Sequence, residues 1–358
     1  MEFSQNYFRQ HLGIKWPLIL APLGGGPSTP ELVAAVTNSG GLGSFAAAYL
    51  PPGQIEEEAR RLRDLTSGPF AINLFAPSPL CRINPEQLKK ALQITGKYRK
   101  ELNLPEPNFA PPFAENFERQ MDVILKIKPA VFSFTFGLVS PDIIRECRQF
   151  NILTMGTATT FEEGLALQNA GVNAVVAQGI EAGGHRGTFL KKQDSLLGTF
   201  ALTRILSNLD IPVIAAGGIM DGQGIAAALA LGADAVQLGT AFLLCKEAGT
   251  STSYRQALLN SPHDSTRLTN AFSGRYARGI ANRFMLEVEQ DQDAILPFPL
   301  QNALTRDIRR KAAELQEPQF LSLWAGQGFK LIREMETEQL MHTLYSETSA
   351  AMKQLGRE

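Results

Sequence analysis

The stretch PVIAAGGIMDGQGIAAALALGADAVQLGTAF, residues 212–242, contains the pattern from which the fold is predicted. A short apolar run ends in two glycines, an alanine-rich segment follows from a capping aspartate, and a second apolar run again ends at glycine. Strands that are covered on both faces are apolar throughout rather than alternating. We therefore expect a strand, a helix and a second strand parallel to the first, joined by a right-handed crossover.

The same unit recurs along the chain. Apolar runs that end in glycine, proline or a small polar residue alternate with helix-favouring segments such as TPELVAAVTNSG and TFEEGLALQNAG. Eight runs can be counted, at residues 17–22, 41–45, 70–75, 130–137, 152–158, 174–179, 212–218 and 235–242. Eight units close a (β/α)₈ barrel, so we predict an α/β protein of that fold. A doubly wound open sheet is the alternative, because such a count is easily wrong by one or two.

Two regions depart from this rhythm. Residues 76–128 are too long and too rich in proline for an ordinary loop, and we predict an insertion over the barrel mouth there. The repeat stops after the barrel, which we assign to residues 1–246. We expect a smaller appended α+β domain on the substrate side over residues 247–325, and a C-terminal helical segment, residues 326–358, that packs on the barrel.

The composition limits the kinds of partner. With 358 residues, of which 44% are hydrophobic and 19% charged, the chain can bury a sizeable core. A formal net charge of −1 gives no general attraction to nucleic acid or to an acidic membrane. We expect a small-molecule substrate, no nucleic acid and no membrane as partners, and a monomer or a homodimer.

The cysteines and the N-terminus indicate the compartment. Cys81, Cys147 and Cys245 are odd in number and far apart, which favours neither a disulfide framework nor a zinc site, and we predict no metal site. The segment MEFSQNYFRQHLG is too polar for a secretory signal, and the apolar stretch 225–245 is interrupted by polar residues and glycines. We expect a cytoplasmic protein without a membrane span.

The last two units predict a phosphate site. In barrels of this kind, backbone N–H groups after the seventh and eighth strands often hold a phosphate. Gly217, Gly218 and Gly239 allow close approach of the backbone, and Thr240 supplies a hydroxyl. Gly-Gly pairs also occur where a tight turn merely needs positive φ, but two such turns in adjacent units favour phosphate binding.

Polar residues in other units predict a flat ring beside that phosphate. Asn73 and Gln178 are amides within or at the end of apolar runs, where a bound heteroaromatic ring could satisfy them. Hydrogen bonds to neighbouring backbone are an equal alternative for Asn73. With the bare backbone of APLGGG, residues 21–26, these residues indicate a phosphorylated cofactor with a planar ring.

The segment VVAQGIEAGGHRGTF, residues 175–189, supplies a candidate catalytic group. His185 follows Gly183 and Gly184 in the loop that leaves the sixth strand, which should place its ring at the barrel mouth. Imidazole has an ordinary pKa of about 6.5 and could take a proton from carbon or stabilise developing negative charge. A loop histidine bonded to backbone is the structural alternative. Glu181 and Arg186 are expected to pair with each other or to orient this loop.

Several segments resemble a known family. APLGGGPSTPELVAAVTNSGGLG, FAINLF, FSFTFG and GTATTFEEGLALQNAGVNAVVAQGIEAGGHRG resemble, in order, the motifs of class I nitronate monooxygenases, formerly called 2-nitropropane dioxygenases. The resemblance runs from about residue 15 to residue 242 and returns in FSGRYARGIANRFM and LWAGQG. Ordered motifs are far more specific than a single glycine loop.

The resemblance implies a TIM barrel that holds non-covalent FMN and oxidises an alkyl nitronate, such as propionate 3-nitronate, with O₂ to a carbonyl compound and nitrite or nitrate. It makes His185 the catalytic residue. Leu23 stands where the family commonly has methionine, so a different side-chain contact to the flavin is expected there. The cofactor-binding residues that the motifs and the resemblance predict together are Ala21, Pro22, Leu23, Asn73, Gln178, Gly183, Gly184, Gly217, Gly218, Gln237, Leu238, Gly239 and Thr240.

Two other functions are compatible with such a barrel. One is an NAD(P)H-dependent flavin reductase, of the enoyl-reductase or the NADH:quinone reductase type. The other is a non-catalytic protein that binds a flavin or a phosphate, because a fold does not fix a function.

Overall fold

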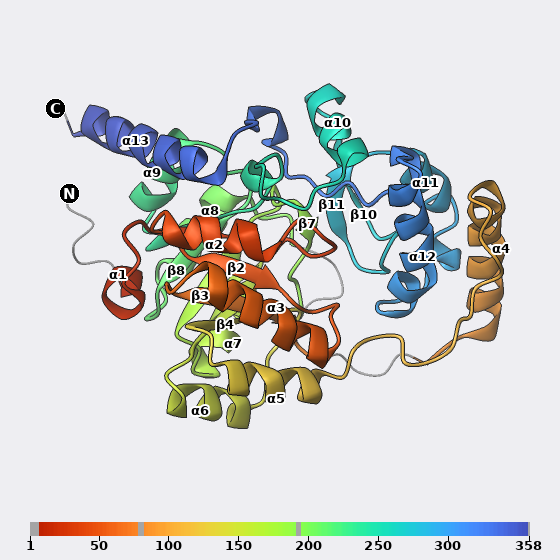
Figure 1. The fold of residues 1–358 in the computed structure, drawn as a ribbon, viewed down its shortest axis with the longest axis horizontal. Coiled ribbons are helices and arrows are strands. Elements are labelled where there is room, and N and C mark those ends of the chain that lie inside the picture. The colour runs from red at the N-terminus through yellow and green to blue at the C-terminus, as the bar shows by residue number, and fades with distance from the viewer. Residues whose placement is uncertain (1–6, 78–81, 191–194, 357–358) are drawn as a thin grey trace.

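The computed structural model describes residues 7–77, 82–190 and 195–356, and its centre is a barrel of eight parallel strands (Figure 1). Neighbouring strands follow the order β1-β9-β8-β6-β5-β4-β3-β2. The barrel closes where Leu20 donates its N–H to the Leu42 carbonyl at 2.9 Å and Leu42 donates to the Leu18 carbonyl at 2.9 Å. The strands are β1 (Leu18–Leu20), β2 (Gly43–Ala46), β3 (Phe70–Phe75), β4 (Val131–Thr135), β5 (Leu153–Ala158), β6 (Ala174–Gln178), β8 (Val213–Ala216) and β9 (Ala235–Leu238). The predicted barrel is confirmed, in place of the open sheet.

The barrel strands are mostly apolar because both of their faces are buried. Along β6, Val175 and Ala177 belong to the core between strands and helices, whereas Val176 belongs to a second core cluster inside the barrel. Alternate side chains of the strand are therefore buried on opposite faces of the barrel wall.

Helices cover the outside of the barrel, and their beginnings are capped as the sequence suggests. Thr29, Thr160 and Asp221 each accept the N–H of the residue three positions on. The helices around the barrel are α1 (Tyr7–Leu12), α2 (Pro30–Asn38), α3 (Pro52–Leu65), α5 (Phe117–Ile127), α6 (Pro141–Gln149), α7 (Phe161–Asn169), α8 (Thr199–Leu206), α9 (Gly222–Ala230) and α13 (Thr337–Leu355). The last of these packs against α9 and α2, so the end of the described chain supplies the helix that the unit after β9 lacks (Figure 1).

A second group of elements, here called the appended layer, lies at one side of the barrel (Figure 1). Its antiparallel sheet has the order β10-β11-β7, and β7 contains His185. A separate apolar cluster that includes Phe272, Phe284 and Phe329 forms its core. Its elements are β7 (Gly184–His185), α10 (Thr252–Asn260), β10 (Thr266–Thr269), β11 (Ala277–Ile280), α11 (Arg283–Val288), η3 (Gln292–Ala294), α12 (Leu300–Glu314), η4 (Pro318–Phe320) and η5 (Phe329–Leu331).

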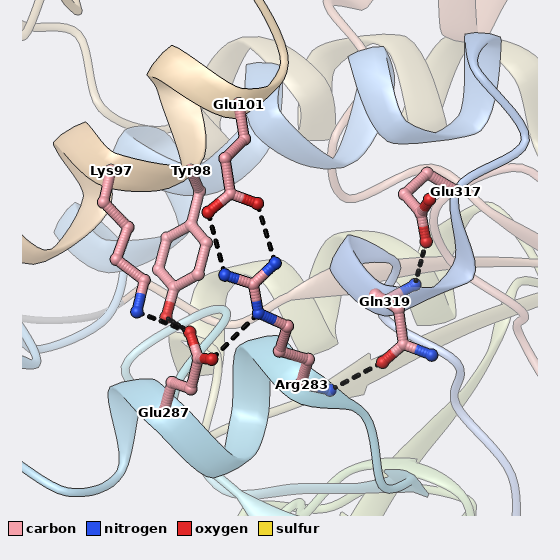
Figure 2. Close-up of polar contacts among 7 residues, drawn as sticks. All are labelled: Lys97, Tyr98, Glu101, Arg283, Glu287, Glu317 and Gln319. Atoms are coloured by element: carbon pink, nitrogen blue, oxygen red, sulfur yellow. Dashed lines mark hydrogen bonds and ion pairs between the residues drawn. The ribbon is translucent and has the colours of Figure 1, made fainter.

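The segment 76–128 divides between the two parts. Its helix α4 (Pro85–Glu101) packs against η3 and α12 of the appended layer, whereas α5 packs against α3 and β3 of the barrel. Figure 2 shows how α4 is joined to α11: Arg283 donates to both carboxylate oxygens of Glu101, at 2.7 and 2.8 Å, and to Glu287 at 2.8 Å. Lys97 and the buried Tyr98 also bond Glu287. A segment far away in sequence thus becomes part of the appended layer.

The described helices include none that is long and apolar enough to cross a membrane. Cys147 and Cys245 are buried free thiols, and burial is the first cause that raises the pKa of each. Cys81 lies outside the described residues.

Candidate active site

A cavity of about 560 Å³ opens at the carboxyl ends of the barrel strands. Barrels of this kind carry their active sites at that end. The structure brings to it the side chains or backbone of Ala21, Pro22, Leu23, Asn73, Gln178, Gly183, Gly184, His185, Gly217, Gly218, Gln237, Gly239 and Thr240. Leu238 does not line the cavity: its side chain is buried in the core, and its carbonyl accepts the N–H of Ala21 at 2.8 Å.

The turn after β8 has the backbone that only glycine adopts readily. Gly217 and Gly218 have φ values of 123° and 72°. A Cβ at Gly217 would lie 2.6 Å from Thr199 Oγ1, and one at Gly218 would lie 3.0 Å from Glu181 Cβ. Among the described residues, the N–H of Gly218 has no acceptor. This turn offers a free backbone donor to the cavity.

The turn after β9 adds a hydroxyl. Thr240 Oγ1 accepts the N–H of Gly326 at 3.0 Å, so its own proton is available to a ligand. Gly326 belongs to the LWAGQG segment, and a Cβ there would lie 2.7 Å from the Glu181 carbonyl. Close backbone contact therefore brings a segment of the appended layer against the predicted phosphate turns.

The two cavity amides have different partners. Asn73 donates to Ser133 Oγ at 3.1 Å across β3 and β4. Gln178 donates to the His185 carbonyl at 2.9 Å and accepts the N–H of Gly187 at 2.8 Å. The Gln178 side chain thus fixes the backbone on both sides of residue 186.

The neighbours of His185 orient the loop rather than line the cavity. Glu181 accepts from the N–H and the hydroxyl of Thr199 at the start of α8, at 2.8 Å each. Arg186 is fully buried and donates to the carbonyls of Gln178 and Gly179. This agrees with the expectation that both residues orient the loop, and the structure shows no ion pair between these two described side chains.

The tautomer of His185 follows from its partner. Ser273 Oγ donates its single proton to the Arg275 carbonyl at 3.0 Å. It therefore accepts at 2.8 Å from a proton on His185 Nε2. The lone pair of the neutral ring is then on Nδ1, for which the described residues provide no hydrogen-bond donor.

The surroundings of His185 keep it neutral. Burial, together with the positive charges of Arg275 and Arg309, lowers the pKa of His185 to about 3. Without an anion in the cavity, the ring is a proton acceptor at every pH above that value.

Aromatic side chains surround His185 on the cavity side. The ring centroids of Phe136 and Trp324 lie 5.7 and 5.5 Å from that of His185, and Phe75 lies 4.4 Å from Phe136. Phe136 has a φ of 81°, which is costly for a residue with a Cβ, and the Arg275 guanidinium lies 3.9 Å from its ring centroid. The backbone is strained at the point where it directs this ring into the cavity.

Sequence reasoning missed several residues that line the cavity or contact His185. Ser273 and Trp324 lie within motifs that the resemblance noted, but nothing local tied either to His185. A second group of missed lining residues consists of polar side chains from the loop after β2 and from α12, namely Tyr49, Asn302, Arg306, Arg309 and Arg310. The clustering of arginines on one helix is the signal that could have indicated the second group.

Comparisons with known proteins agree with this geometry. The nitronate monooxygenase family model matches residues 6–347. A probable nitronate monooxygenase of Staphylococcus aureus is 40% identical over 98% of this chain and 99% of its own length. Among solved structures, a nitroalkane oxidase from Streptomyces ansochromogenes is 37% identical, with a TM-score of 0.89 over 97% of this chain and 99% of its own. FabK from Thermotoga maritima is 26% identical, with a TM-score of 0.77 over 98% of each chain.

The match by sequence covers nearly the whole chain, and the fold is shared with a solved structure at high similarity. The protein is therefore an enzyme that belongs to the nitronate monooxygenase family of flavin-dependent oxidoreductases.

Proposed function

We propose that this enzyme binds FMN non-covalently and oxidises alkyl nitronates with O₂, releasing a carbonyl compound and nitrite or nitrate. The observation that carries the proposal is the neutral ring of His185 in the same cavity as the glycine turns after β8 and β9. The family match supports nitronate oxidation as the reaction. FMN and propionate 3-nitronate are the specific cofactor and substrate that we propose.

The residues present fit a flavin mononucleotide. The turn at Gly217 and Gly218 leaves a backbone N–H free, and Thr240 has a free hydroxyl proton, which are the donors that a phosphate needs. Gly25 and Gly184 face open space, so the backbone is uncovered where a planar ring would lie. When bound, FMN would supply the electron-transfer chemistry with the nitronate and O₂.

His185 would act on protons. With a neutral nitroalkane, Nδ1 would accept the proton from the carbon that bears the nitro group, while Ser273 holds Nε2–H and so fixes the ring. With a nitronate, that proton is already absent. The anion would offset the positive charges of Arg275 and Arg309 and raise the pKa of His185, so that a protonated ring could hold the substrate.

The aromatic wall would exclude water from this point. Phe75, Phe136 and Trp324 surround the imidazole, and their low polarity would strengthen its interaction with an anion. This wall also suits the alkyl part of the substrate.

The test begins with the purified protein and its released cofactor, which should be FMN. Oxygen uptake with propionate 3-nitronate should exceed NADH oxidation with a quinone, and the flavin should stay oxidised when NADH or NADPH is added without oxygen. A colourless protein that does not take up FMN would refute the cofactor proposal.

The second candidate is an NAD(P)H-dependent flavin reductase. The structural similarity to FabK from Thermotoga maritima, at 26% identity, is the observation in its favour. Rapid anaerobic bleaching of the flavin by NADH or NADPH, with no oxygen uptake on nitronate, would select it.

A further inference from the structure

The charged side chains that line the cavity have one sign. Among the lining residues that the structure describes, Arg306, Arg309 and Arg310 are the charged ones, and no aspartate or glutamate accompanies them. All three lie on α12, in the appended layer, whereas the glycine turns belong to the barrel. A wall of this kind attracts anions and disfavours cations.

The guanidinium of Arg309 is held in place and has a nitrogen available to bind an anion. Its Nη2 donates to Asn302 Oδ1 at 2.7 Å and to the Asn302 carbonyl at 3.1 Å, which holds the guanidinium in place. Its Nη1 has no partner among the described residues, and no ion pair to Arg309 is found there. Burial lowers the pKa of Arg309, as expected for a guanidinium that lacks a full counter-charge.

A second unsatisfied group belongs to a residue that lines the same cavity as Arg309. The hydroxyl of Tyr49 is buried and has no hydrogen-bond partner among the described residues. Tyr49 and Arg309 both line the cavity, and burial raises the pKa of Tyr49 to about 12, so the phenol keeps its proton. A neutral O–H and a guanidinium N–H without acceptors together form a donor pair for an oxyanion.

The nearest carboxylate on α12 is engaged elsewhere. Asp307 accepts two hydrogen bonds from Arg99 of α4, at 2.9 and 2.7 Å. Only 4% of the Arg99 side chain is exposed, so this pair is mostly withdrawn from water. Among the described residues, no carboxylate forms an ion pair with any of the three cavity arginines.

We propose that Arg309 and Tyr49 form an anion subsite that selects nitronates with a second negative group, a carboxylate, at the end remote from the nitronate. This inference rests on the proposed function. The subsite is made by α12 and the loop after β2, whereas the predicted phosphate turns follow β8 and β9. Arg306 and Arg310, which are exposed, draw the anion toward the cavity.

Paired substrates test the selection in the flavin-loaded enzyme. Propionate 3-nitronate and propyl 1-nitronate differ by the carboxylate, and the ratio of their kcat/KM values measures its recognition. We expect Arg309→Met to lower that ratio about 10- to 100-fold, as for the loss of a charge-assisted hydrogen bond. Lys311→Met removes a positive charge from the same helix at a position outside the cavity and should leave the ratio unchanged.

Tyr49→Phe is a second variant that tests the subsite even if Arg309→Met does not fold. It removes only an oxygen that has no partner, so it should fold normally and lower the ratio roughly 3- to 10-fold. Equal losses for both nitronates, or an unchanged ratio in both variants, would overturn the subsite. Loss of FMN affinity in Arg309→Met would also overturn it, because the arginine would then hold the cofactor.

A binding measurement separates this inference from the proposed function. Calorimetric titration of the anaerobic enzyme with 3-nitropropionate and with 1-nitropropane needs no turnover. Tighter binding of the carboxylate compound that disappears in Arg309→Met supports the subsite, even if the wild-type enzyme oxidises neither nitronate. Equal affinities in the wild-type enzyme refute it, whatever the activity.

Discussion

At the scale of single residues, the environment of His185 sets what the ring can do. A solvent-exposed imidazole would be partly protonated near neutral pH, but here burial and two nearby arginines favour the neutral form. Ser273 takes the Nε2 proton and so determines which nitrogen is free. The strained Phe136 covers the ring from the cavity side.

Replacement of His185 by asparagine tests its role as a base. We expect turnover of neutral nitroalkanes to fall by a factor of roughly 10² to 10⁴, the usual contribution of a general base, while the flavin content stays unchanged. Steady-state oxygen uptake and the flavin absorbance per protein measure the two quantities. Unaltered turnover would exclude the base, and loss of the flavin would make His185 a structural residue.

The pH dependence of the reaction with neutral nitroalkanes follows from the lowered pKa. A base must be unprotonated, so activity is present above its pKa and lost as the pH falls through it. Because the pKa of His185 is lowered to about 3, kcat/KM should show no loss from this group between pH 8 and pH 5. Profiles of initial rates check this. An acidic limb centred near the ordinary imidazole value, about 6.5, would contradict the buried, neutral ring.

The sequence predicted His185 but not its partners, and the reason is sequence distance. His185 stands next to a glycine pair at the end of an apolar run, which is a local signal. Ser273 lies 88 residues further along the chain, and only the pairing of β7 with β11 brings that region beside the ring. No local pattern records such a pairing.

At the scale of elements, α4 connects to the appended layer through two kinds of ion pair. Arg99 to Asp307 joins α4 to α12, and it is withdrawn from water on the arginine side. Arg283 to Glu101 joins α4 to α11 and is exposed, with 40% and 39% of the two side chains accessible (Figure 2). Both ion pairs have an N–O distance of 2.7 Å, but water screens the exposed pair. The exposed pair should therefore contribute less to stability.

Matched arginine substitutions should show that difference. Arg99→Met leaves the Asp307 carboxylate partly buried without a partner, and we expect it to cost about 2–3 kcal/mol of unfolding free energy. Arg283→Met should cost at most about 1 kcal/mol, because its pairs are screened by water. Urea unfolding of both variants measures the values. Equal costs would show that burial does not govern these contacts.

The barrel strands were predictable from sequence because each is a continuous apolar run that ends in a turn residue. The segment 76–128 was harder. Its length indicated an insertion, but its two helices go to different places: α5 has a periodic apolar face for the barrel, whereas α4 depends on Tyr98 and Arg99 to meet the appended layer. Partners at long sequence separation decide such a placement, and a single sequence does not record them.

At the scale of the whole molecule, the cavity lies between two separately packed parts. The barrel supplies the glycine turns, and the appended layer supplies β7, α12 and the segment around Gly326. The position of one part against the other therefore fixes the distance from the predicted phosphate turns to His185 and to α12. The fold class followed from counting units, but this relative position depends on backbone contacts that only the structure reveals.

Gly326 offers a direct test of that contact. A Cβ at this position would lie 2.7 Å from the Glu181 carbonyl and 3.1 Å from the Gly183 nitrogen, so Gly326→Ala must push the appended layer away from the barrel. We expect a loss of about 1–3 kcal/mol in unfolding free energy, together with weaker flavin binding, because Thr240 accepts the N–H of the same residue.

Gly96→Ala is the matched control, since a Cβ at Gly96 in α4 meets nothing within 4 Å. There the same substitution should stabilise the protein by about 0.5–1 kcal/mol, because alanine favours helix over glycine, and should leave flavin affinity unchanged. Thermal unfolding with and without FMN, and a flavin titration, measure both effects. If Gly326→Ala behaved like Gly96→Ala, the close contact between the two parts would not control the site, and the cavity would have to be fixed by the barrel alone.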